Sequence, residues 1–112
     1  MYIYVEQWTP KQAWQDASPE KRQAFIESIM PIIRKHEEEM GIETIAMASI
    51  DPEIPHGTGH AYVSVLRMPD EATARQFERD IASVDWYTYF DQANTRGKIR
   101  SAEEVIGEHI TM

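Results

Sequence analysis

The sequence of 112 residues contains no cysteine. Disulfide bonds, thiolate zinc sites and cysteine nucleophiles are therefore excluded, and nothing points to an oxidising compartment. No stretch approaches the roughly 18 consecutive apolar residues of a membrane-spanning helix. The N-terminus also lacks the basic start and apolar run of a signal peptide. We therefore expect a soluble, cytoplasmic protein with no membrane partner.

Basic residues are few, with 11 lysines and arginines against 19 acidic residues and a net charge of −8. Such a charge repels phosphate backbones, and no basic cluster offsets it locally. We therefore expect no nucleic-acid partner. The hydrophobic content of 42% excludes a disordered chain and suffices for one modest core. Residues 1–112 are expected to form a single domain.

Residues 2–8 and 59–68 alternate as β-strands with two unlike faces. One face of each segment is aliphatic, whereas the other mixes aromatic, hydroxyl and ionisable side chains. A mixed face of this kind suits the lining of a pocket better than a dry core or a solvated surface. A third strand is expected over residues 42–51, with both faces covered. The mixed faces carry Tyr2, Tyr4, Glu6 and Trp8 in the first segment, and His60, Tyr62, Ser64 and Leu66 in the second.

The first long helix is expected over residues 19–40. Ser18 caps its start, and Gly41 ends it in a left-handed conformation. Pro31 lies inside the helix and is expected to kink it, because proline lacks an amide hydrogen. His36 lies on the apolar stripe of this helix. Either it is a core-edge histidine bonded to a neighbour, or it has a catalytic or ligand-binding role.

A second helix is expected over residues 71–84, capped by Asp70. The fourth strand follows at residues 91–96. A Ser-x-x-Glu capping box at Ser101 then begins a short C-terminal helix that ends near Glu108. The side chains expected to face inward from that helix are Val105, Ile106 and Ile110.

Two segments lie outside these elements. Residues 86–90 include four aromatic side chains, too many for one buried face, so some must reach a second apolar surface, a ligand or a partner chain. His56 and His60 flank a turn that follows two acidic residues. Their spacing is a weak metal signal because no helix places both imidazoles on one face, and a polar loop is the simpler interpretation. A metal hydrolase that uses these histidines is the least favoured of the functional hypotheses considered below.

The order strand, helix, strand, strand, helix, strand predicts an α+β domain of the ferredoxin-like βαββαβ type. It has a four-stranded antiparallel sheet with both helices on one face. We expect the helices to cover the aliphatic face. The opposite face is too apolar for water, so a second copy is expected to cover it and form a homodimer. The aliphatic face carries Ile3, Val5, Ala61, Val63 and Val65. The opposite face carries Tyr2, Tyr4, Trp8, Ile45, Met47, Tyr62 and Leu66.

This order of elements resembles the dimeric α+β barrel superfamily, which includes the antibiotic-biosynthesis-monooxygenase-like proteins. Residues 13–33 (AWQDASPEKRQAFIESIMPII) and 89–97 (YFDQANTRG) are similar to the small darcynin-like proteins. The resemblance implies the fold and the dimer, but no catalytic set. Haem-degrading relatives hold iron through a histidine on the second helix, and residues 71–84 contain none, so we expect no cofactor. The shared series is Trp14, Ser18, Arg22, Phe25 and Pro31.

The first functional hypothesis is a protein that binds or transforms a small apolar or aromatic molecule, such as a polyketide-like compound. The cavity would lie against the sheet, between it and the helices or a second sheet. A cofactor-free, monooxygenase-like oxygenation or an isomerisation fits such a site. His60 would act as the base, with Tyr62 and Glu6 positioning the substrate. The substrate-binding residues would be Tyr4, Trp8, Met47, Ser64, His36 and Trp86.

The alternative is a non-enzymatic dimeric interaction module whose interface is filled by side chains. Its aromatic run would then contact another protein, because large aromatic residues often anchor interfaces. The anchors would be Trp86, Tyr87 and Tyr89.

Overall fold

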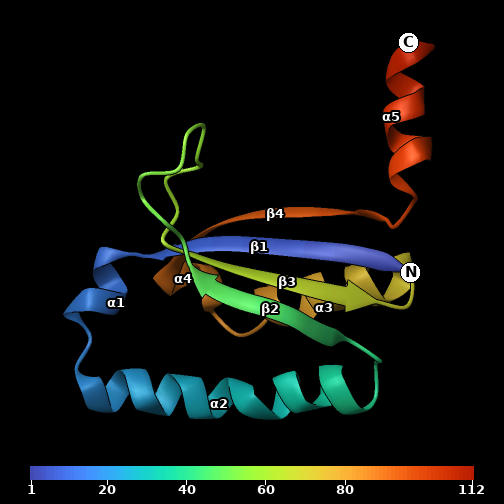
Figure 1. Ribbon diagram of the computed structural model, residues 1–112. Coiled ribbons are helices and arrows are strands. Elements are labelled where there is room, and N and C mark those ends of the chain that lie inside the picture. Colours follow the sequence, from blue (N-terminus) through green and yellow to red (C-terminus); the bar gives the residue numbers. More distant parts are fainter.

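Four antiparallel strands form one sheet in the order β2-β3-β1-β4 in the computed structural model, which describes residues 1–112 (Figure 1). The predicted ferredoxin-like α+β fold is confirmed. None of the helices is long and apolar enough to cross a membrane. The strands are β1 (Tyr2–Pro10), β2 (Glu43–Ser49), β3 (Tyr62–Met68) and β4 (Phe90–Lys98). The helices are α1 (Gln12–Asp16), α2 (Pro19–Glu38), α3 (Glu71–Ala82), α4 (Trp86–Tyr89) and α5 (Ala102–Ile110).

The ends of the two long helices follow their capping residues. Ser18 Oγ accepts a hydrogen bond from the backbone amide of Lys21, and Asp70 caps α3 in the same way through Thr73. Helix α2 continues through Pro31 without interruption. Beyond its end, Gly41 adopts a φ of +67°, a left-handed conformation that glycine adopts without strain.

The mixed face of the sheet packs against the helices, so the predicted assignment of the two faces is wrong. Tyr4 is 1% exposed, whereas its neighbour Ile3 is 39% exposed. The mixed face tolerates burial because its polar ends find partners: the Tyr4 hydroxyl donates to Glu78 on α3 over 3.1 Å. The buried core cluster consists of Tyr4, Ile42, Leu66, Met68, Ala74 and Phe77.

The aliphatic face of the sheet is left open, because helices α2 and α3 lie on the other side (Figure 1). Helix α5 extends from the end of β4 away from the helix layer, as does the loop between β2 and β3 (Figure 1). Apolar side chains of α5 are exposed, with Ile106 at 63% and Ile110 at 83%. The prediction that this helix faces inward is therefore wrong within a single chain.

A β-bulge in β2 changes which of its side chains face the helices. Thr44 pairs with Leu66 and Ala46 with Val65, so Ile45 is an extra residue in the strand. An extra residue reverses the alternation of side chains beyond it. Thr44 and Met47 consequently both line the cavity between sheet and helices, although simple alternation places them on opposite faces.

The aromatic run around α4 packs within the chain. The ring of Trp86 stacks on Phe90 with a centroid distance of 4.1 Å, and Phe90 lies 4.8 Å from Trp14. Tyr89 contacts Phe25 of α2 at 5.0 Å. The second apolar surface expected for these aromatics is thus supplied by α1 and the start of α2.

Candidate functional site

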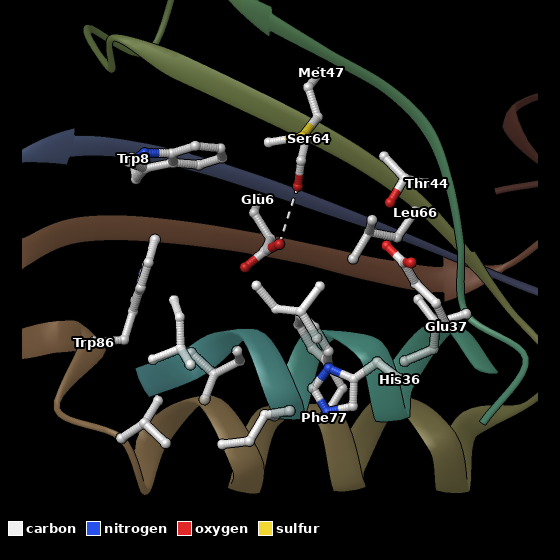
Figure 2. A pocket seen from close by; sticks show the side chains of 16 residues that line it. Glu6, Trp8, His36, Glu37, Thr44, Met47, Ser64, Leu66, Phe77 and Trp86 are labelled. Atoms are coloured by element: carbon white, nitrogen blue, oxygen red, sulfur yellow. Dashed lines mark hydrogen bonds between the residues drawn. The ribbon is translucent and has the colours of Figure 1, made fainter. Parts of the chain in front are cut away.

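A cavity of about 210 Å³ lies between the mixed face of the sheet and helices α2 and α3 (Figure 2). Eleven of its sixteen lining residues are hydrophobic, and the lining contains no lysine or arginine. A cavity of about 150 Å³ holds benzene in an engineered protein. The space is therefore suited to a single substituted ring. The polar side chains of its lining are Glu6, His36, Glu37, Thr44 and Ser64.

Glu6 projects from β1 into the middle of this cavity (Figure 2). One carboxylate oxygen, Oε1, accepts a hydrogen bond from Ser64 Oγ at 3.0 Å. The other, Oε2, accepts one from Gln92 Nε2 at 2.8 Å. Burial raises the pKa of Glu6, and this effect outweighs the two hydrogen bonds, which lower it. The result is a carboxyl group that binds a proton more readily than an ordinary glutamate.

Gln92 is held in one orientation by Trp86. The indole nitrogen of Trp86 donates to Gln92 Oε1 at 2.6 Å. Because indole can only donate, the amide oxygen of Gln92 must face Trp86 and its amide nitrogen must face Glu6. The same nitrogen also donates to Asn94 at 2.7 Å. Sequence reasoning missed Gln92, whose position opposite Trp8 depends on the β1–β4 register.

His36 enters the cavity from α2 and is 3% exposed. Its Nε2 lies 2.8 Å from Asp80 Oδ2 on α3. Burial alone would raise the pKa of Asp80, but hydrogen bonds from His36 and Gln76 bring this pKa below its ordinary value. The His36 ring packs against Phe77 with a centroid distance of 5.1 Å. Asp80 thus remains ionised and fixes the position of the imidazole.

Six of the nine predicted site residues line this cavity. Tyr4 is one of the three that do not. Its side chain lies in the core, with the hydroxyl on Glu78. Burial and the nearby Glu78 carboxylate raise the pKa of Tyr4, so it remains a neutral hydroxyl. The six residues at the cavity are Glu6, Trp8, Met47, Ser64, His36 and Trp86.

Tyr62 and His60 lie outside the lining. Tyr62 stacks on Trp8 at 5.9 Å and is 40% exposed. His60 Nδ1 lies 3.0 Å from Thr9 Oγ1, and the residue borders a separate hollow of about 240 Å³ beside the β2–β3 loop. Only two of the seven residues around that hollow are hydrophobic. No group of three or more histidine, aspartate or glutamate side chains is arranged to hold a metal ion.

Sequence comparison places the chain in a family. Residues 1–112 match the model of DUF6616, a family of unknown function. The chain belongs to this family. A search of curated proteins finds no match.

Solved structures show the same fold at low sequence identity. A chlorite dismutase-like protein superposes with a TM-score of 0.69 and 14% identity, covering 96% of this chain and 48% of that protein. An Arabidopsis thaliana protein gives a TM-score of 0.62 at 12% identity, with 91% and 98% coverage. A dimeric ferredoxin-like protein of unknown function from Thermobifida fusca gives 0.50 at 12%, with 88% and 90% coverage.

These likenesses agree with the predicted ferredoxin-like α+β fold. The DUF6616 chain spans about half the length of the chlorite dismutase-like protein. At such identities the likeness describes the fold alone, because one fold hosts many unrelated functions. The function must therefore be argued from the cavity itself.

Proposed function

We propose that the cavity binds a small, mainly apolar molecule of single-ring size and that Glu6 takes part in its cofactor-free, isomerase-like conversion. The observation that carries this proposal is the carboxyl group of Glu6, which lies in an apolar cavity that raises its pKa. Titratable groups with raised pKa values in apolar clefts are frequent acid–base catalysts.

The charge of the lining favours a neutral ligand over an anion. The lining carries the carboxyl groups of Glu6 and Glu37 but no lysine or arginine. His36 is the one side chain of the lining that can carry a positive charge, and Asp80 already balances that charge from 2.8 Å. A carboxylate or phosphate ligand would therefore find no unpaired cation, which is costly in an apolar site. The net charge of −8 also repels anionic ligands from the protein as a whole.

Isomerisation fits these groups better than oxygenation. Moving a proton within a molecule conserves its composition and needs only an acid and a base, which the lining supplies. Oxygenation would in addition require a place for molecular oxygen beside the substrate. An interaction module that uses the aromatic run is less well supported, because Trp86 and Tyr89 already pack against Phe90 and Phe25.

The test is a titration with acetophenone, a neutral single-ring ketone, and with benzoate, an anion of similar size. Indole N–H signals in nuclear magnetic resonance spectra report binding. Trp8 and Trp86 line the cavity, whereas Trp14 does not and serves as the internal control. We expect acetophenone to shift the first two signals and benzoate to leave all three in place. Equal responses to both compounds, or none to acetophenone, would refute the proposal.

We also propose that the protein is a homodimer in which the open aliphatic faces of two sheets meet. Support comes from the uncovered face with Ile3 at 39% exposure, and from the structural likeness to a dimeric ferredoxin-like protein. The cavity lies on the other side of the sheet, so each chain would keep its own site.

A further inference from the structure

His36 has one nitrogen engaged and one nitrogen free. Its Nε2 is bonded to Asp80 Oδ2 at 2.8 Å. An ionised carboxylate can only accept hydrogen bonds, so the proton of the neutral imidazole must be on Nε2. Nδ1 is then a proton acceptor when the ring is neutral and a donor when it is charged.

Nδ1 of His36 faces the cavity. In Figure 2 one ring nitrogen is turned toward the sheet side, where Glu6 lies, and the other toward α3. Nδ1 has no hydrogen-bond partner in the protein. Every fully buried side-chain nitrogen or oxygen atom does have a partner, so Nδ1 is not fully buried. The residual exposure of this otherwise buried residue therefore includes Nδ1. An unpartnered polar atom of a nearly buried side chain that faces a cavity is available to form a hydrogen bond with a ligand there.

Glu6 approaches the same space from the opposite wall, on β1 (Figure 2). The two groups are close enough for the charge of His36 to lower the pKa of Glu6, against the larger effect of burial. A pair of titratable groups on two sides of an apolar cavity is the arrangement needed to remove a proton at one position and return it at another.

We infer that His36, oriented by Asp80, is the second acid–base group of the site and acts with Glu6 on neutral carbonyl compounds that tautomerise. This inference rests on the proposed function. In the step, the Glu6 carboxylate takes a proton from the carbon beside the carbonyl group. The C–H electron pair forms a carbon–carbon double bond, and the carbonyl oxygen gains the Nδ1 proton of charged His36. The product is the enol, and proton exchange with water restores both residues.

The kinetic test follows deuterium exchange into the methyl group of acetophenone in heavy water. We expect exchange above background with wild type, and a loss of about 100-fold or more in both His36→Asn and Glu6→Gln. The double variant should lose no more than either single variant, because the two groups act as one unit. His109→Asn, on the exposed helix α5, is the matched control and should exchange as wild type does.

The two proposals fail in different ways. If acetophenone does not shift the indole signals of Trp8 and Trp86 in wild type, the proposed function itself fails. If acetophenone binds both wild type and His36→Asn while exchange is equal in the two, the role of His36 is refuted and the binding site remains.

A second measurement needs neither a ligand nor a His36 variant. Nitrogen-15 spectra of the histidine rings identify which nitrogen carries the proton in neutral His36. We expect Nε2–H in wild type and a mixture of tautomers in Asp80→Asn, because the amide can also donate. Asp80→Glu should restore part of the Nε2–H form. A proton on Nδ1 in wild type would overturn the assignment of Asp80 as a positioning residue.

Discussion

At the scale of single residues, the ionisation of Glu6 couples the site to the stability of the fold. The folded state raises the pKa of Glu6 above its ordinary value of 4.5. The folded protein therefore binds this proton more tightly than the unfolded chain does. Stability must then fall as pH rises from the ordinary pKa through the raised one.

Glu6→Gln removes the ionisable group but keeps both hydrogen-bond partners. Its amide oxygen accepts from Gln92, and its amide nitrogen donates to Ser64. We expect the variant to unfold at higher urea concentration than wild type at about pH 7, with a difference that shrinks toward about pH 4. Glu53→Gln, in the exposed β2–β3 loop, is the control and should stay within about 0.5 kcal/mol at both pH values. If Glu6→Gln is less stable than wild type at neutral pH, the conclusion that the buried charge of Glu6 destabilises the fold is wrong.

Six residues of the cavity lining could be predicted from the sequence, but not the chemical role of each. Glu6 and Ser64 were found because alternation places them on one face of their strands. The predicted base, His60, precedes the start of β3 and contacts Thr9 instead. His36 lines the cavity instead. The sequence left its role open, because helical periodicity shows which residues share one face of α2 but not which residue of another helix lies opposite. Its partner Asp80 follows from the packing of α2 against α3.

At the scale of elements, Pro31 should weaken α2. A proline inside a helix is about 3 kcal/mol less favourable than alanine. Its restriction of the unfolded chain returns about 0.4–1 kcal/mol. We therefore expect Pro31→Ala to raise the free energy of unfolding by about 2 kcal/mol, measured by urea denaturation. Pro19→Ala is the matched control, because Pro19 stands at the first turn of the same helix, where proline is tolerated.

The opposite result for Pro31→Ala would also be informative. Equal or lower stability than wild type would mean that the proline shapes the second half of α2, which carries Ile32, Ile33 and His36 to the cavity. The acetophenone titration would then weaken in this variant and stay unchanged in Pro19→Ala.

Element order and type were predictable because capping residues and periodicity are local signals. The side of the sheet that the helices cover is not local. Alternation divides Ile3 from Tyr4 but does not say which one meets α3, and the long tyrosine reaches Glu78 where a valine would not. The bulge at Ile45 was equally hidden, because it is defined only by the pairing of β2 with β3.

At the scale of the whole molecule, α5 requires a contact that its own chain does not provide. Isolated helices shorter than about 12–15 residues are marginal in water, and α5 has 9 residues. Its capping box and the exposed ion pair of Arg100 with Glu108, at 2.7 Å, add little. Packing of its apolar side chains must therefore supply the stability. The open face of a second copy offers an apolar surface of the kind this requires.

This reasoning predicts a dimer in sedimentation experiments and slow hydrogen exchange of the α5 amides within it. Val65→Asp places a charge on the open face next to Val5, so we expect a monomer in which the α5 amides exchange rapidly. Ile26→Asp makes the same change at an exposed position on α2, 38% exposed and outside the cavity lining, and should leave the dimer intact. A monomeric wild type would refute the interface. Slow exchange of α5 in monomeric Val65→Asp would show instead that the helix is stable without a partner.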